Sequence, residues 1–129
     1  MVCTDTSFVV ALERREPSAL QKMQGLMDEG EVVYTTSVTV AELYRGAYSS
    51  KDKVKALKDA EGLLGFFATL NLDYDSGRIW GDLANTLKSD TIGDRDLFIA
   101  SIAIANKQTL ITKNKKHFER VPGLQIEGW

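Results

Sequence analysis

The chain has 129 residues, of which 43% are hydrophobic and 26% are charged, a balance typical of one globular domain and not of a disordered chain. Its 16 Lys and Arg residues against 18 Asp and Glu residues give a net charge of −2, so contact with a polyanion requires a local basic patch or bound cations. The single cysteine, Cys3, and the single histidine, His117, exclude an internal disulfide and metal sites that need several Cys or His ligands.

The sequence predicts neither a targeting signal nor a membrane span. Residues 1–15 carry Asp5 and Glu13 and lack a basic start followed by a long apolar run. The longest apolar stretches are far shorter than the ~20 residues that cross a bilayer. We therefore expect a reduced, cytoplasmic protein.

Strand and helix patterns alternate along the chain. Short β-branched or apolar runs predict strands at Val2–Thr4, Val32–Thr35, Thr69–Leu72, Thr109–Thr112 and Leu124–Glu127. Apolar spacings of three and four predict helices at Phe8–Arg14, from an N-cap at Ser18 to a stop at Gly30, from a cap at Ser37 to Tyr48, at Lys51–Leu64, at Asp75–Lys88, and from Asp94 or Arg95 to Asn106. Strands separated by helices form βαβ units, so we expect a single three-layer α/β domain over residues 1–129 with a mostly parallel sheet flanked by helices.

Two aspartates lie where a carboxylate is unusual. Asp5 directly follows the first strand, at the edge of a parallel sheet where functional residues gather, although an aspartate there can equally be a helix N-cap. Asp96 lies in the first turn of an almost wholly apolar helix, so its charge needs hydrogen bonds, an ion pair or a cation. Asp94 is the natural N-cap of that helix, and we therefore favour a site role for Asp96.

Glu42 is not marked by its own helical pattern. The apolar residues of its helix lie largely on the opposite face, which favours a solvated glutamate that pairs with Arg45 one turn away. Gly46, also one turn on, would leave room beside Glu42 for a ligand or another chain.

Polar residues follow the strand predicted at Thr109–Thr112. The hydroxyl of Thr112 could orient a carboxylate, and the side-chain carbonyl of Asn114 could hold a metal-bound water. Asn114 equally suits an ordinary turn.

Basic residues are concentrated near the C-terminal end. Residues 107–120 hold five Lys or Arg against one acid, Glu119. Such a run is usually a solvated surface, but beside an acidic site it would suit phosphate contacts. We expect His117 to be a packing or surface residue and Cys3 to be a small buried core residue.

Four segments occur in a characteristic order and span nearly the whole chain. They are Asp5-Thr6-Ser7, Ser37 to Gly46 around Glu42, Ile92 to Ser101 around Asp96, and Thr112 to Leu124, with Trp129 at the end. Together they resemble the PIN-domain proteins, and within that group the VapC toxins of bacterial and archaeal toxin–antitoxin pairs.

The resemblance implies an endoribonuclease that hydrolyses RNA, for example tRNA, with Mg²⁺ or Mn²⁺ held by carboxylates. By position, Asp5 and Asp96 would be the principal metal ligands and Glu42 the third acid, which overrides the helical pattern around Glu42. Where many relatives have a fourth acid, this chain has Asn114. Supporting roles would fall to Ser7, Asp94, Thr112 and Asn114. RNA contacts would come from Arg45, Lys113, Lys115 and Lys116.

These residue types suit that chemistry. Clustered carboxylates raise one another's pKa values unless a cation is present, and Mg²⁺ prefers oxygen ligands. A bound ion can activate water and neutralise charge on a phosphodiester, so no histidine is required. The expected products carry 5′-phosphate and 3′-hydroxyl ends. The resemblance also implies a VapB-like antitoxin that lies over the active-site groove, and a homodimer.

Three other functions remain open from the sequence. A PIN-type domain can be a catalytically silent binding scaffold, although the presence of Asp5, Glu42 and Asp96 argues against it. A phospho-acceptor receiver domain would need a carboxylate pair at the first site, which is not evident. A haloacid-dehalogenase-type phosphatase would need an acid where this chain has Ser7.

Overall fold

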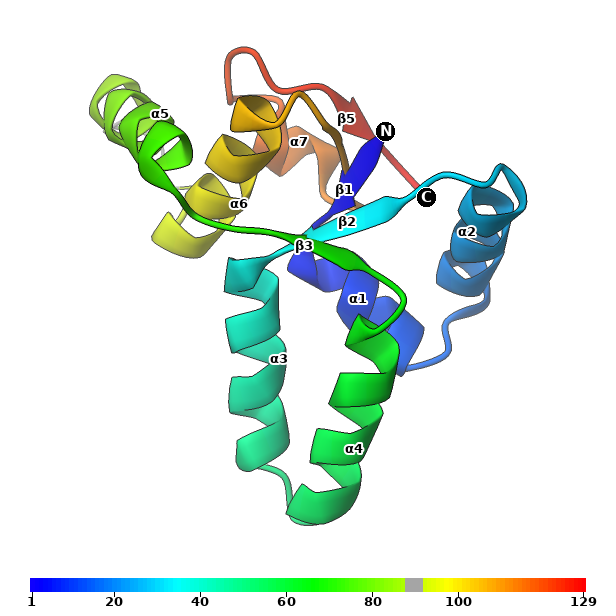
Figure 1. Cartoon of the computed structure of the whole chain (residues 1–129). Coiled ribbons are helices and arrows are strands. Elements are labelled where there is room, and N and C mark those ends of the chain that lie inside the picture. The colour runs from blue at the N-terminus through cyan, green and yellow to red at the C-terminus, as the bar shows by residue number, and fades with distance from the viewer. Residues whose placement is uncertain (88–91) are drawn as a thin grey trace.

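The computed structural model describes residues 1–87 and 92–129, which form alternating strands and helices (Figure 1). The strands are β1 (Val2–Thr4), β2 (Val33–Thr36), β3 (Ala68–Leu70), β4 (Thr109–Ile111) and β5 (Ile126–Glu127). The helices are α1 (Thr6–Glu13), α2 (Pro17–Asp28), α3 (Ser37–Tyr48), α4 (Lys53–Leu64), α5 (Tyr74–Thr86), α6 (Asp94–Ala105) and α7 (Lys115–Phe118).

The described strands form one parallel sheet in the order β3-β2-β1-β4-β5. Val2 of the central strand β1 pairs with Val33 of β2 on one side and with Thr109 of β4 on the other. The order of the strands therefore reverses direction at β1, and the crevice beside such a switch point is where open α/β sheets bind ligands. Receiver domains have the order 2-1-3-4-5, so this sheet is not that of a receiver.

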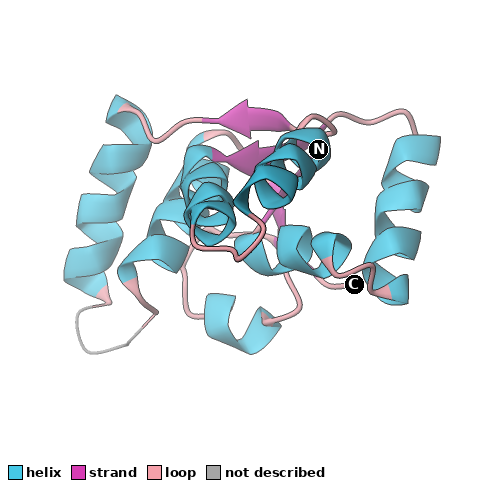
Figure 2. Cartoon of the chain, turned by 90° about the horizontal axis from the view of Figure 1, so that it is seen from below, coloured by secondary structure: helices cyan, strands magenta, loops and turns pink. Residues whose placement is uncertain are grey.

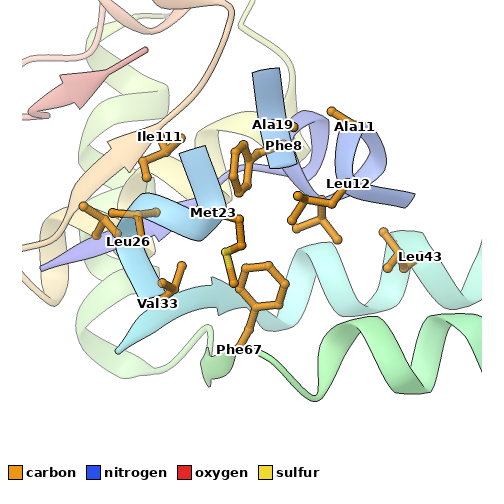
Figure 3. Packing of buried hydrophobic residues seen from close by; sticks show 12 residues of the cluster. Phe8, Ala11, Leu12, Ala19, Met23, Leu26, Val33, Leu43, Phe67 and Ile111 are labelled. Carbon is orange, nitrogen blue, oxygen red and sulfur yellow. The ribbon is translucent and has the colours of Figure 1, made fainter. Parts of the chain in front are cut away.

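Alternation along the short strands places a hydrophobic core on each face of the sheet. Val2 and Ile111 face a core with α1 and α2, whereas Cys3 and Leu110 face a core with α5, α6 and α7. Figure 3 shows the first core, in which Phe8 is fully buried. Helices on both sides of the sheet (Figure 2) confirm the predicted three-layer α/β architecture.

Helices α3 and α4 form an antiparallel hairpin that extends away from the sheet (Figure 1). The N-cap of α3 is Thr36, the last residue of β2, whose hydroxyl accepts from the backbone N–H of Thr39 at 3.2 Å. Because strand and helix share this junction, the first turns of α3 begin at the carboxyl edge of the sheet. This junction places Glu42, on α3, near the carboxyl edge of the sheet.

Three predicted helix caps are wrong. Pro17 occupies the first position of α2, where a missing N–H costs nothing, so Ser18 lies inside the helix. Thr36 caps α3, and the hydroxyl of Ser37 instead accepts from the backbone N–H of Leu72 at 3.2 Å. Gly93, not Asp94, is the N-cap residue of α6.

The other predicted boundaries agree with the structure, as for β1 and the C-terminal ends of α3 and α4, or differ by one or two residues. The strand expected at Val32–Thr35 is shifted by one residue, and α4, capped by Asp52, begins at Lys53, two residues later than its predicted start. The predicted end of α5 at Lys88 lies outside the described residues. The short helix α7 was not predicted, because one turn has no periodicity to recognise.

None of the described helices is long and apolar enough to cross a membrane.

Candidate active site

The candidate site lies at the carboxyl ends of β1, β2 and β4. Asp5 directly follows β1, Thr112 directly follows β4, and Glu42 lies on α3, which begins where β2 ends. All of these strands are parallel, so their carboxyl ends meet at one edge. The first turn of α6 brings Asp96 to the same edge.

Asp5 is both a helix cap and a buried acid. Its Oδ1 accepts from the backbone N–H of Phe8 at 3.0 Å and from the hydroxyl of Ser7 at 2.7 Å. Burial raises the pKa of Asp5 above its ordinary value, although hydrogen bonds from Thr112, Ser7 and the Phe8 N–H act to lower that pKa, and the charge of Asp96 raises it. The capping and site interpretations of Asp5 are thus compatible, because the helix cap uses Oδ1 and does not involve Oδ2.

Glu42 is held by two other elements. Its Oε1 accepts from the hydroxyl of Thr6 on α1 at 2.8 Å, and its Oε2 lies 3.4 Å from Nη1 of Arg95 on α6. The predicted pairing with Arg45 is therefore wrong: the partners of Glu42 lie 36 and 53 residues away in sequence. The solvated position predicted from the helical pattern is also wrong, because the side chain is only 24% exposed.

A chain of hydroxyl groups supports the Glu42 carboxylate. Because an ionised carboxylate only accepts, Thr6 donates to Glu42, and its oxygen is free to accept from Thr39, 2.9 Å away. Thr39 accepts in turn from Thr36 at 3.4 Å. Thr36 and Thr39 are fully buried, so these hydroxyls have fixed positions and direct their donors towards Glu42.

Asp96 is held by a residue of α7, near the C-terminal end of the chain. Its Oδ2 lies 3.0 Å from Nε2 of His117 on α7, and its side chain remains 42% exposed. The helix turn that carries Asp96 begins at Gly93, whose φ of +94° is a conformation that glycine adopts far more easily than other residues.

The loop after β4 contacts both aspartates. The Thr112 hydroxyl accepts from the backbone N–H of Asn114 at 3.0 Å and lies close enough to Asp5 to lower the pKa of that carboxyl group. The Asn114 carbonyl accepts in turn from the backbone N–H of His117 at 3.1 Å. The side chain of Asn114 is exposed, and no capping bond from it to α7 is present.

A pocket of about 490 Å³ opens between Glu42 and the start of α6. Its lining residues are Glu42, Ile92, Gly93, Asp94, Arg95 and Asp96. A second pocket of about 400 Å³ lies on the other side of Glu42, between α1, α3 and α4, and also exposes Glu13 and Asp59. The carboxylates make both hollows acidic, which suits cations or basic side chains and repels a free phosphate.

The comparisons with known proteins agree with this geometry. A family model described as PIN domain matches residues 2–124. Ribonuclease VapC2 of Rickettsia felis is 31% identical over 97% of this chain and 95% of its own, and the tRNA(fMet)-specific endonuclease VapC of Salmonella typhimurium is 33% identical with the same coverage. The chain belongs to the PIN-domain family, in its group of VapC ribonucleases. The crystal structure of VapBC2 from Rickettsia felis bound to a promoter DNA fragment superimposes with a TM-score of 0.91 at 28% identity, covering 100% of this chain and 99% of that one.

Within this PIN domain the predicted site residues are not all equally close. The charge of Asp96 raises the pKa of Asp5, and Glu42 and Asp96 line one pocket with Asp94. The predicted RNA-contacting residues are exposed: Arg45, Lys113, Lys115 and Lys116. Among residues 1–87 and 92–129, no three Asp, Glu, His or Cys side chains form a complete metal-binding cluster.

Three residues of this PIN domain were missed as site residues. His117 was expected to be a packing or surface residue, yet it bonds to Asp96. Arg95 and Thr6 were not singled out, yet both hold Glu42. Thr6 could have been found from its place beside Asp5, but the partners of His117 and Arg95 depend on the folded sheet and leave no local signal.

Proposed function

We propose that the chain is a Mg²⁺-dependent endoribonuclease toxin of the VapC kind, with Asp5, Asp96 and Glu42 as its site acids. One observation carries the proposal: three segments distant in sequence bring three partly or fully buried carboxylates to the switch-point edge of the sheet, each held by its own hydrogen bonds. Holding like charges near one another is costly, and a cation removes that cost.

The donor set fits Mg²⁺ or Mn²⁺ without a complete cage of protein ligands. Mg²⁺ commonly binds one or two carboxylates, keeps several waters and takes further oxygens from a phosphate substrate. Asp5 and Asp96 suit this role because the hydrogen-bond donors of Asp5 are neutral groups, and Asp96 adds a second negative charge. Glu42, beside the same pocket, would reach the ion directly or through water.

The protein residues then have separate tasks. A bound divalent ion would neutralise phosphate charge and assist the attack of water. Asp5 and Asp96 would hold and orient the ion, while the hydrogen bond from the Thr6 hydroxyl fixes the position of the Glu42 carboxylate as an acceptor for a proton or a water. Asn114 presents a neutral amide and no charge of its own for a second ion, so the proposal needs only one bound ion.

The substrate we propose is structured RNA, with tRNA as the first candidate. One relative is named a tRNA(fMet)-specific endonuclease. Exposed cationic residues occur on two segments that also carry site residues: Arg45 lies on α3 with Glu42, and Lys113, Lys115 and Lys116 follow Thr112 after β4. Proteins that cut structured RNA recognise loop shape and phosphate positions, and exposed basic residues on two separate segments suit such contacts.

We propose a VapB-like antitoxin as the protein partner. The superimposed Rickettsia felis structure is a VapBC complex. Both hollows beside Glu42 are acidic, so a basic antitoxin side chain placed there would pair with carboxylates that the metal ion otherwise needs. The antitoxin would then inhibit the nuclease by pairing with the carboxylates that the metal ion needs.

We also propose a homodimer. A largely apolar hollow of about 420 Å³ beside the site includes Val38, Leu72 and Phe98. Apolar surface of this kind is covered in most stable assemblies. Light scattering on the purified chain would measure a mass of two copies, and a mass of one copy would contradict the dimer without affecting the catalytic proposal.

The test of the nuclease proposal is RNA cleavage by the purified chain, freed of antitoxin, with total cellular RNA and Mg²⁺ or Mn²⁺. We expect discrete fragments with 5′-phosphate ends, which a kinase labels only after dephosphorylation. EDTA should abolish them. The Asp96→Asn variant should lower the cleavage rate by more than about 100-fold, because a metal ligand matters at least as much as the groups around it.

Asp75→Asn is the matched control. Asp75 is an exposed acid in the first turn of α5, as Asp96 is in the first turn of α6, so both substitutions remove the same charge from a helix N-terminus. The control should cleave like the wild type. Failure of folded, metal-loaded wild type on several RNA pools would favour the silent scaffold, and undiminished cleavage by Asp96→Asn would disprove the assigned site.

A further inference from the structure

His117 is the one histidine of the chain, and the nuclease chemistry proposed above has no role for it. Its Nε2 lies 3.0 Å from Oδ2 of Asp96, and its side chain is only 19% exposed. An ionised carboxylate only accepts hydrogen bonds, so Nε2 must carry the hydrogen. The ring is therefore a donor to the acid that we assign to the metal.

The His117 ring is fixed by its surroundings. It meets the ring of Phe118 edge to face, with centroids 5.2 Å apart, and Phe118 is 2% exposed in the core that α5 and α6 form with the sheet. The backbone N–H of His117 donates to the carbonyl of Asn114, which ties the imidazole to the loop after β4. A side chain restrained in this way can restrain its partner.

The segment from Thr112 to His117 reaches both aspartates. Thr112, directly after β4, lies close enough to Asp5 to lower its pKa, and His117, on α7, bonds to Asp96. Asp5 comes from the end of β1 and Asp96 from the start of α6, so neither element alone sets the distance between the two carboxylates. The segment from Thr112 to His117 contacts both and can set that distance.

We propose that His117 is a positioning residue: its Nε2–H holds Oδ2 of Asp96 and so directs the other oxygen, Oδ1, towards the divalent ion. This inference rests on the proposed function only in treating Asp96 as a metal ligand. Hydrogen bonds to ligating carboxylates typically change metal affinity by about 10- to 100-fold. His117 itself neither binds the ion nor touches the RNA in this proposal.

Two substitutions separate the hydrogen bond from the packing of the ring. His117→Phe keeps an aromatic ring against Phe118 but removes the donor, whereas His117→Gln places an amide N–H close to the position of Nε2. Mn²⁺ binding, measured from the electron paramagnetic resonance signal of free Mn²⁺ without RNA, should weaken about tenfold in His117→Phe and less than about threefold in His117→Gln. In cleavage assays, His117→Phe should need about tenfold more Mn²⁺ for half-maximal rate, with kcat at saturating Mn²⁺ largely restored.

A double-mutant cycle shows whether His117 acts through Asp96. In the Asp96→Asn background, His117→Phe should cause no further loss of Mn²⁺ affinity. Equal losses in both backgrounds would overturn the inference, as would wild-type Mn²⁺ binding by His117→Phe or a His117→Gln variant as weak as His117→Phe.

A measurement on the unmodified ring covers the case in which His117→Phe does not fold. Because the chain has one histidine, its two ring ¹⁵N signals are unambiguous. At a pH where the ring is neutral, wild type should show the Nε2–H tautomer, and Asp96→Asn should shift the population towards Nδ1–H. An Nδ1–H tautomer in wild type would overturn the inference. Absence of Mn²⁺ binding and of cleavage in wild type would instead refute the proposed function, whatever the tautomer.

Discussion

Asp5 combines two demands that usually oppose each other. As the N-cap of α1 it accepts a backbone hydrogen bond in a buried place, and as a site acid it must carry a charge there. Capping recovers only part of the cost, because burial raises the pKa of Asp5 in spite of three hydrogen bonds. The residue is therefore held in a form that a metal ion would stabilise.

The charge of Asp5 should destabilise the metal-free protein. We expect Asp5→Asn to raise the Tm in EDTA at pH 7.5 by a few degrees, which for a chain of this length corresponds to about 1 kcal/mol. Asparagine caps helices as well as aspartate does, so α1 keeps its cap. Thermal unfolding followed by circular dichroism measures the difference.

The pH dependence has a definite sign. The folded pKa of Asp5 is raised above its unfolded value, so the stability of the wild type falls as pH rises through the folded pKa and recovers as pH is lowered. The Tm advantage of Asp5→Asn should therefore be largest near neutral pH and shrink towards pH ~4, the ordinary range of aspartate. A Tm below that of wild type at every pH would mean that the hydrogen bonds of the charged form outweigh its burial.

How much of the site could be predicted differs from residue to residue. Asp96 was favoured from its position, because an acid in an apolar helix needs a compensating partner, whereas the position of Asp5 after a buried strand suited a helix cap equally well. Glu42 required the family resemblance, because periodicity describes only its own helix, whereas its partners Thr6 and Arg95 lie on α1 and α6. His117 was missed, because no sequence pattern around a lone histidine indicates a hydrogen-bond partner 21 residues away.

At the scale of elements, α6 depends on the residue at which it begins. Gly93 has φ +94° and ψ 143°, so the chain enters the helix from a conformation that side chains disfavour. Three residues later the helix presents Asp96, and a change in the entry angle would move that carboxylate. The predicted cap at Asp94 missed this, because capping preferences favour aspartate and do not report backbone conformation.

A matched pair of glycine substitutions tests this dependence. At both Gly93 and Gly25 an added Cβ would meet nothing within 4 Å, so only the backbone conformation differs. Gly93→Ala should destabilise the protein by about 1–3 kcal/mol and slow RNA cleavage. Gly25→Ala, inside α2, should stabilise it by up to about 1 kcal/mol. Equal Tm values for Gly93→Ala and wild type would show that the entry to α6 does not need its left-handed conformation.

The order and type of the elements were predictable, whereas several of their boundaries were not. Periodicity and β-branched runs identified each described strand and helix except α7, because these patterns reflect which faces are buried. The N-terminal caps of α2 and α3 were missed, because Pro17 is already the first residue of α2 and Thr36, the last residue of β2, caps α3. The strand order reflects pairings between distant segments, which no local pattern contains.

At the scale of the whole molecule, one thin sheet joins two separate cores. Neighbouring residues of β1, Val2 and Cys3, belong to opposite cores, so neither core can form without the strand that both share. The site acids lie at the edge of this sheet and receive contacts from both sides, Glu42 from α1 and α6, Asp96 from α7. We infer that the site geometry requires both cores to be folded at once.

The two tryptophans make this inference measurable. Trp129 packs edge to face on Phe8 in the α1 core, with centroids 4.9 Å apart, and Trp80 stacks on Phe98 in the α5–α6 core at 4.7 Å. The variants Trp80→Phe and Trp129→Phe each leave one fluorescent reporter, on one side of the sheet. Their thermal transitions should agree in midpoint with circular dichroism, as expected of a small two-state domain.

A core substitution on one side should then be felt equally on the other. Leu83 is 6% exposed in the α5–α6 core, and truncating a buried leucine to alanine costs about 2–5 kcal/mol. Introduced into Trp80→Phe, Leu83→Ala should lower the transition reported by Trp129, across the sheet, as much as it lowers the circular dichroism transition. If the midpoint reported by Trp129 stays unchanged while the circular dichroism midpoint falls, the two cores unfold separately. Asp5 and Glu42 could then remain positioned after Asp96 and its partners are lost.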